Sequence, residues 1–255
     1  MSPWLTNPSF PHKMTFSIAA HCPRTGQLGV AVSTAVPAVG AMCPYVKPGV
    51  GAVSTQSWVN PYLAIEALDL MEQGRSGPEA LTAVLERDGA KDLRQIGVVD
   101  AQGRAASWSG ESCTEWFGHI VDRHFAVQGN MLVGEATVSA MAAAFRGDEA
   151  LDLAERMLLA LEAGQAAGGD KRGRQSASLK VYASEDYALW DLRVDEHAYP
   201  VAELRRVFEI ARLQLLPFVK GMPKRSVEAG AVPAYVSDML LKSPPDRPGG
   251  GGSAL

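Results

Sequence analysis

The chain has 255 residues, of which 47% are apolar, and its formal net charge is −4. This size and composition allow one good-sized hydrophobic core, and the acidic balance argues against a nucleic-acid surface, which is usually basic. No apolar run approaches the roughly 20 residues of a membrane-spanning helix. The opening stretch MSPWLTNPSFPHK also lacks the apolar region of a secretory signal.

The three cysteines, Cys22, Cys43 and Cys113, show no metal-ligand spacing. An odd number of cysteines fits a reducing compartment better than a disulfide framework. We therefore expect a cytoplasmic protein with no metal site, no cofactor, and neither nucleic acid nor a membrane as partner.

The strand pattern begins at Thr15. Residues 1–13 contain three prolines and are expected to be a flexible leader or a misassigned start. TFSIAAHCP then predicts one strand, RTG a turn in which Gly26 can adopt positive φ, and QLGVAVST a second strand. PGVGAVSTQ predicts a third. The last two strands carry few polar side chains, which is typical of a sheet covered on both faces.

From residue 61 the apolar spacing becomes helical, and strands return later. The predicted elements are two helices (61–74 and 76–89), a hairpin (94–110), a strand (124–134), two helices (135–147 and 148–169, the second capped by Asp148), two strands (176–184 and 187–196) and an amphipathic helix (200–218). The Pro/Gly/Ser-rich tail, 221–255, is predicted to be disordered. This leaves one domain, residues 14–220.

Hairpins that alternate with helix pairs do not fit the strict strand–helix alternation of a doubly wound parallel sheet. They predict an α+β fold, a four-layer α/β/β/α sandwich in which two antiparallel sheets stack and helix pairs cover them. The residues expected between the layers are Ile18, Val30, Val32, Val50, Val53, Val98 and Val181.

Two glycine-rich stretches depart from nucleotide-binding patterns. Ser54 stands where the third glycine of a dinucleotide fingerprint would be, and Asp170 stands where a phosphate-binding loop would have its lysine. Neither stretch predicts a nucleotide site.

Four stretches carry a resemblance to a known family: MTFSIAAHCPRTGQLGVAV, PGVGAVSTQSWVNP, FAVQGNMLVGEATV and EAGQAAGGDKRGRQSASL. In these the chain resembles the bacterial family called domain of unknown function 1028. That family is placed among the N-terminal nucleophile hydrolases, the superfamily of the proteasome β subunits and several amidases. The resemblance spans residues 14–218 and implies the same four-layer fold, but the family name supplies no activity.

The superfamily implies a nucleophile at Thr15. Its members attack a carbonyl with an N-terminal Thr, Ser or Cys, whose own α-amine takes the proton, and such an amine titrates at about 7.7–8.0. Thr15 would qualify after loss of residues 1–14, either by trimming of Met14 as a true start or by removal of a propeptide. The alternative is an ordinary strand threonine, and Ser17 is a weaker candidate on the same strand face.

Other candidate residues follow from the same resemblance and from local chemistry. Lys47 would lower the pKa of the nucleophile, as a lysine does in the proteasome, or is a solvated loop lysine. Gln56 and Asn130 lie where donors to an oxyanion are expected, with Gly129 allowing a ligand close to the backbone. The alternative for these three is turn formation and helix capping.

The loop GGDKRGRQS, residues 168–176, is the densest polar stretch. The resemblance implies that Asp170 orients the amine or Lys47, with Arg174 and Gln175 binding substrate. Asp170 and Arg174 are predicted to face the same cleft as Thr15. The alternative is an exposed charged connection.

The sequence thus predicts an amidohydrolase that cleaves an amide or peptide-like bond in a small substrate through Thr15. An inactive binding or scaffold protein with the same fold is the alternative, and a cysteine hydrolase using Cys22 or Cys43 is more remote. The amphipathic last helix and the family analogy also predict a homo-oligomer.

Overall fold

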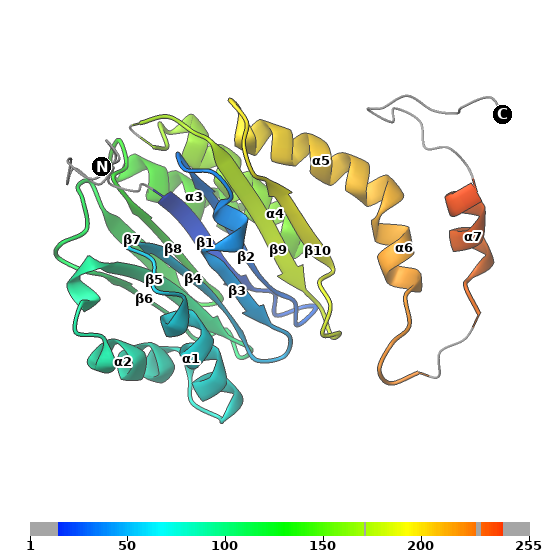
Figure 1. The fold of residues 1–255 in the computed structure, drawn as a ribbon, viewed down its shortest axis with the longest axis horizontal. Coiled ribbons are helices and arrows are strands. Elements are labelled where there is room, and N and C mark those ends of the chain that lie inside the picture. The colour runs from blue at the N-terminus through cyan, green and yellow to red at the C-terminus, as the bar shows by residue number, and fades with distance from the viewer. Residues whose placement is uncertain (1–14, 171, 228–230, 242–255) are drawn as a thin grey trace, which may run out of the picture.

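The computed structural model describes residues 15–170, 172–227 and 231–241. Within these residues, strands form two antiparallel sheets that stack face to face, and helices cover the outer face of each (Figure 1). The four-layer α/β/β/α prediction is therefore confirmed. The predicted leader, 1–13, and the end of the predicted disordered tail lie outside the described residues.

The larger sheet has six strands in the order β10-β9-β2-β1-β8-β7. Its strands are β1 (Thr15–His21), β2 (Leu28–Thr34), β7 (Gly118–Asp122), β8 (Phe125–Asn130), β9 (Ser176–Tyr182) and β10 (Trp190–Val194). β1 and β2 are central and covered on both faces, which explains why every residue in them is buried.

The smaller sheet has four strands in the order β3-β4-β5-β6. Its strands are β3 (Pro44–Lys47), β4 (Gly51–Ser57), β5 (Arg94–Asp100) and β6 (Ala105–Ser109). The sequence did not predict β3 or β7. Both are edge strands of four or five residues and neither is fully buried, so neither shows a clear apolar pattern.

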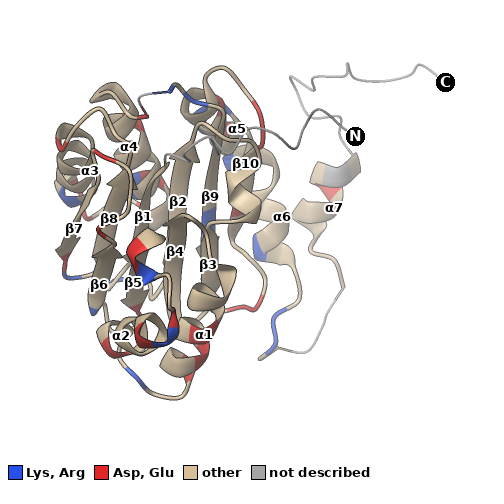
Figure 2. Cartoon of the chain, turned by 60° about the vertical axis from the view of Figure 1, so that its left-hand side comes forward, with Lys and Arg blue, Asp and Glu red and all other residues tan. Residues whose placement is uncertain are grey.

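Helices α1 (Pro61–Glu72) and α2 (Gly77–Arg87) cover the smaller sheet, and α3 (Ala136–Gly147) and α4 (Leu153–Ala166) cover the larger one. Helix α5 (Pro200–Gln214) lies beside α4 over β9 and β10. Charged residues gather on the helices and on the turns at the sheet ends (Figure 2). The layers between them are consequently low in charge.

The helix boundaries follow local capping. Asn60 caps α1 by accepting from the Tyr62 N–H at 3.2 Å, and Ser76 and Glu79 form a capping box at the start of α2. Helix α4 begins at Leu153, so the predicted start at Asp148 is wrong. The Asp148 carboxylate instead accepts from the Ala150 N–H at 2.9 Å and forms a turn.

The core consists of separate clusters on the two faces of the larger sheet, because successive side chains of a strand point to opposite faces. Phe16 and Ile18 of β1 pack in the cluster beneath α3 and α4, whereas Ala19 packs against the smaller sheet. Of the seven residues predicted between the layers, six are fully buried: Ile18, Val30, Val32, Val53, Val98 and Val181. Val50 lies at the β3–β4 turn and is only partly buried.

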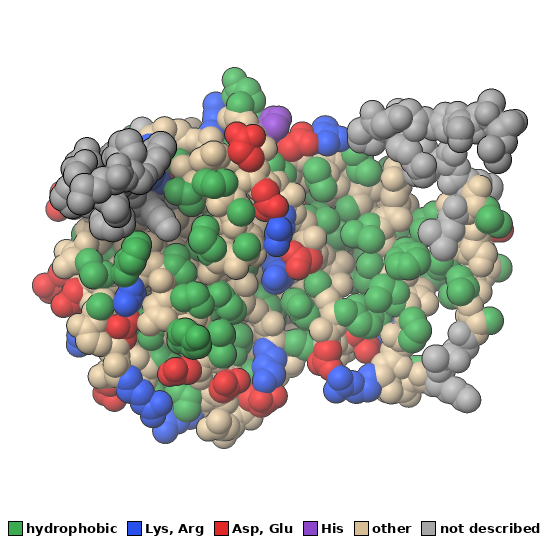
Figure 3. All heavy atoms as spheres, viewed as in Figure 1, with side chains coloured by type: hydrophobic (Ala, Val, Ile, Leu, Met, Phe, Trp, Pro, Cys, Tyr) green, Lys and Arg blue, Asp and Glu red, His purple; other side chains and the backbone are tan. Residues whose placement is uncertain are grey.

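The predicted last helix divides at Leu215 into α5 and the short α6 (Leu216–Gly221), which has a proline in its first turn. Helix α7 (Ala234–Leu241) falls within the segment whose composition predicts disorder. Hydrophobic side chains are exposed on this part of the molecule (Figure 3). Phe218 and Tyr235 are among the exposed residues. None of the described helices is long and apolar enough to cross a membrane.

Two histidines meet at the end of β1 that is remote from Thr15. The Nδ1 atoms of His21 and His124 are 3.1 Å apart, so one proton is shared between them. Burial lowers the pKa of both imidazoles. The charge of His124 lowers the pKa of His21 further, although Asp100 opposes this, and Arg123 lowers the pKa of His124.

We expect the free energy of unfolding to fall as the pH drops below about 6.5, the pKa of an unperturbed histidine. Each histidine has a lower pKa in the folded chain than in the unfolded chain. Between these two pKa values the unfolded chain therefore binds more protons, which stabilises the unfolded state relative to the folded state. Urea unfolding at pH 7.5, 6.5 and 5.5 measures the effect. His124→Asn, which tolerates the positive φ of 76° at this position, should flatten the slope.

His197→Gln is the matched control, because it removes an exposed histidine and leaves the His21–His124 pair in place, so the slope caused by this pair should remain. His119, whose pKa is also lowered by burial, remains in both variants. An unchanged slope in His124→Asn would contradict the assignment to this pair.

Candidate active site

Thr15 is the first residue of β1, between Thr34 on β2 and Asn130 on β8. By the alternation of β1, its side chain lies on the face that meets the smaller sheet. The residue is 3% exposed, and its Oγ1 is 3.2 Å from Oγ1 of Thr34. A potential nucleophile and a second hydroxyl are therefore paired in a buried position.

A network of buried amides holds this end of β1. Gln56 on β4 donates from Nε2 to the Thr15 carbonyl at 3.1 Å and to Gln95 Oε1 at 2.8 Å. Asn130 Nδ2 donates to the same Gln95 oxygen at 2.8 Å. Gln95 Nε2 in turn donates to Ser109 Oγ and to the Gly129 carbonyl, both at 2.8 Å. Gln95 thus connects both sheets around Thr15.

Ser17 belongs to this network. Its hydroxyl donates to Gln56 Oε1 and accepts from Gln128 Nε2, both at 2.6 Å. The Ser17 hydroxyl both donates and accepts a hydrogen bond, and the residue is buried. Ser17 therefore has a structural role rather than that of a nucleophile.

The loop after α4 brings Asp170 to the same end of the sheet. Gly168 and Gly169 adopt φ of 118° and 56°, which turns the chain back from the helix. Asp170 Oδ2 accepts from the Ala35 N–H, just past β2, at 3.1 Å, and its backbone bridges Leu132, just past β8. Because β1 lies between β2 and β8, Asp170 lies across the end of the sheet, just beyond Thr15 at the start of β1.

Asp170 is a buried carboxyl that lies beside the cationic side chain of Arg172. It accepts from the Arg172 N–H at 2.8 Å, and Arg172 Nη2 lies 3.3 Å from Oδ2. Burial raises the pKa of the Asp170 carboxyl, while the hydrogen bonds and charge of Arg172 lower it. A further positive group placed here would favour the ionised form.

The structure does not bring Lys47 to this site. Its Nζ lies 2.6 Å from Glu72 Oε2 and 3.9 Å from Asp69 Oδ1 on α1. Lys47 pairs with Gly51 at the start of β4, whereas Thr15 is held by Gln56 near the end. At about 3.3 Å per residue, these positions are about 17 Å apart along the strand.

Arg174 also lies away from Thr15. It is exposed, its guanidinium stacks 4.4 Å from the ring of Tyr199, and it lines a pocket of about 360 Å³ with residues of α4 and α5. Thr15 does not line that pocket. Gln175, in contrast, lies at the site, because its N–H donates to the Thr34 carbonyl at 2.8 Å.

Gly129 is required by packing. A Cβ added to Gly129 would project from the face of the sheet opposite to the Thr15 side chain, where it would collide with Leu132 Cδ1. This corrects the expectation that it opens the backbone to a ligand. Asn130 lies opposite Thr15, but its amide already donates to Gln95, so it supports the strand.

Sequence reasoning missed Thr34, Gln95 and Gln128. Each is a polar residue in a strand that is buried along its whole length. This contrast was the available signal, because buried polar groups are nearly always paired with one another.

Among solved structures, the chain is similar to protein SPO2555 from Silicibacter pomeroyi, a DUF1028 protein, with 27% identity and a TM-score of 0.77. The match covers 84% of this chain and 96% of that one. The chain also matches Anbu (ancestral beta-subunit) from Yersinia bercovieri at 12% identity and a TM-score of 0.39, covering 83% of this chain and 100% of Anbu. That likeness is too weak to assign a fold or an activity.

No curated protein matches the chain. The model of a family described as a family of unknown function, DUF1028, matches residues 15–204, so the match begins at Thr15 itself. The chain belongs to the DUF1028 family.

Proposed function

We propose that this protein is an amidohydrolase of the N-terminal nucleophile type. It cleaves an amide or peptide-like bond in a small substrate, using Thr15 after the loss of residues 1–14. The observation that carries the proposal is the position of Asp170, which crosses the end of the sheet in line with the start of β1. A free amine on Thr15 would belong at that end, near a buried carboxyl.

In this mechanism Thr15 Oγ1 attacks the substrate carbonyl carbon while the α-amine of Thr15 takes the hydroxyl proton. The resulting ammonium is stabilised by Asp170. The C–N bond then breaks, the ammonium protonates the leaving nitrogen, and an ester on Thr15 remains. Water hydrolyses the ester: the amine takes a proton from the attacking water, and that proton returns to Oγ1 as the acid leaves.

The neighbouring residues position the nucleophile. The Thr34 hydroxyl orients Oγ1 from 3.2 Å, and Gln56 fixes the Thr15 carbonyl. Asn130 and Gln95 hold Gln56 in place, and Gln175 fixes the backbone of Thr34. The chemistry needs no cofactor.

Three forms of the chain test the requirement for a free amine. One is the full chain, one is expressed from Met14 so that trimming leaves Thr15 first, and one carries a glycine before Thr15. We expect hydrolysis only by the chain that begins at Thr15, because an amide nitrogen cannot act as the base. A panel of small amides and short peptides, combined with intact-mass measurement, gives the result.

The form with the added glycine is the matched control, because it shares the fold and the hydroxyl and lacks only the amine on Thr15. Full activity in this form, or in a full chain whose mass shows no cleavage, would overturn the mechanism.

One observation favours a second candidate, a binding or scaffold protein without catalysis. Within the described chain, Thr15 is 3% exposed, with its hydroxyl beside Thr34 and its carbonyl bonded to Gln56. A chain trimmed to Thr15 that hydrolyses no member of the panel would support this candidate.

A further inference from the structure

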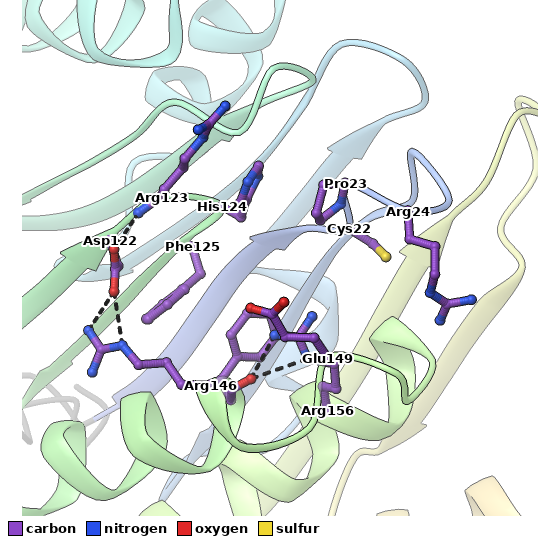
Figure 4. Close-up of a pocket in the computed structure, with 11 residues that line it drawn as sticks. Cys22, Pro23, Arg24, Asp122, Arg123, His124, Phe125, Arg146, Glu149 and Arg156 are labelled. Atoms are coloured by element: carbon purple, nitrogen blue, oxygen red, sulfur yellow. Dashed lines mark hydrogen bonds and ion pairs between the residues drawn. The ribbon is translucent and has the colours of Figure 1, made fainter.

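A second pocket lies at the opposite end of β1 from Thr15. It has a volume of about 600 Å³, within the range typical of small-molecule sites. Cys22 and Pro23 line it just after β1, and the β7–β8 turn and the α3–α4 region form its other walls (Figure 4). β1 has seven residues, so the pocket is about 20 Å from Thr15.

The pocket carries an excess of positive charge in a chain whose net charge is −4. Its charged lining residues are four arginines, Arg24, Arg123, Arg146 and Arg156, and two carboxylates, Asp122 and Glu149. One carboxylate is already neutralised, because Arg146 Nη2 lies 2.8 Å from Asp122 Oδ2. Among the lining residues, Glu149 is then the one carboxylate left for the other three arginines, and Asp148 and Asp152 lie nearby outside the lining.

Arg156 is the unusual member of this group. It is 6% exposed, yet no carboxylate in the described chain lies within 4.0 Å of its guanidinium. Nε and Nη2 donate to the Phe145 carbonyl at 3.2 and 2.8 Å, and the guanidinium stacks 4.1 Å from the Phe145 ring. A buried charge is costly without an opposite charge beside it.

The electrostatics agree with the geometry. Burial lowers the pKa of the Arg156 guanidinium, and the carboxylates of Glu149 and Asp148 oppose this from beyond ion-pair distance. Two of the other arginines are weakly paired or unpaired. Arg24 Nη2 lies 3.8 Å from Asp152, and Arg123, which extends outward at the rim in Figure 4, makes no ion pair among the described residues.

We propose that this pocket binds a small dianion, a molecule with a phosphate group or two carboxylates, with Arg156 as the buried contact and Arg24 beside it. Among the lining residues, four arginines against two carboxylates leave an excess of two positive charges, with Asp148 and Asp152 nearby outside the lining. Phe125 and Pro23 offer an apolar wall for its carbon skeleton. The site is independent of Thr15 and of any hydrolase activity.

Titration of the full chain with inorganic phosphate and with succinate tests the proposal, at constant ionic strength and pH 7.5. Isothermal calorimetry should show saturable binding at one site per chain. Backbone amide shifts should be largest at residues 22–24, 123–125 and 145–149. Binding of phosphate alone assigns a phosphate-bearing ligand, and binding of both anions assigns dianions generally.

Two exposed residues supply variants with opposite expected effects. Arg24→Ala should weaken binding about two- to fivefold, and Glu149→Gln should strengthen it by a similar factor, as expected for partly exposed charges. Arg156→Lys keeps the charge but loses the planar fork and should weaken binding about tenfold. Arg87→Ala, an exposed arginine on α2, is the control and should change nothing.

The result that would overturn the proposal is the absence of saturable binding of either anion by the folded wild-type chain. Equal affinities in Arg24→Ala and Glu149→Gln would overturn it as well. Those two variants keep the test valid even where Arg156→Lys fails to fold.

Discussion

Thr15→Val in the chain that begins at residue 15 should lower amide hydrolysis at least about a thousandfold under the proposed mechanism, because the proposed nucleophile is lost while the amine remains. Valine has nearly the shape of threonine, so the strand should still form. The lost hydroxyl contact with Thr34 should cost about 1–2 kcal/mol of stability. Thr15→Ser should retain part of the rate. Initial rates on the best amide of the panel and urea unfolding measure both effects.

Thr34→Val is the matched control, since it removes the partner hydroxyl across the same 3.2 Å contact. It should reduce the rate without abolishing it, because Thr34 orients the nucleophile and does not react. Undiminished hydrolysis by Thr15→Val would show that another group performs the attack.

Gln95→Leu should lower the free energy of unfolding by about 3 kcal/mol, the scale of several buried polar groups left unpaired. Gln95 Oε1 accepts from both Gln56 and Asn130, and its Nε2 donates to Ser109 and to the Gly129 carbonyl. Leucine fills a similar volume but satisfies none of these partners. Urea unfolding followed by circular dichroism measures the change.

Gln102→Leu makes the same chemical change at an exposed turn and should alter stability by less than about 0.5 kcal/mol. If the two variants were equally stable, the amide network would not be holding the sheets together at this end.

The layer order could be predicted because it depends on long patterns. Hairpins and helix pairs alternate over the whole domain, and capping residues such as Asn60 and Ser76 mark helix starts locally. The short edge strands β3 and β7 could not be predicted, because four or five partly exposed residues form a strand only beside an already ordered neighbour.

For the candidate site, the sequence indicates which residues begin or end a strand, but it does not indicate which strand ends lie together in the fold. The structure places Thr15, Gln56 and Asp170 at one end of the sheet, because a strand start, a strand end and a polar loop meet there. Lys47 was misplaced because the sequence does not reveal which end of β4 meets Thr15. The register is set by pairing, with Lys47 opposite Gly51.

The interlocked amides between the sheets also constrain how the family can diverge. Gln56 and Asn130 both donate to Gln95 Oε1, so the direction in which each of the three amides points depends on the other two. A change at one position leaves a buried donor or acceptor without its partner unless a second position changes with it. Across DUF1028 sequences, these positions should therefore be replaced together rather than drift one at a time.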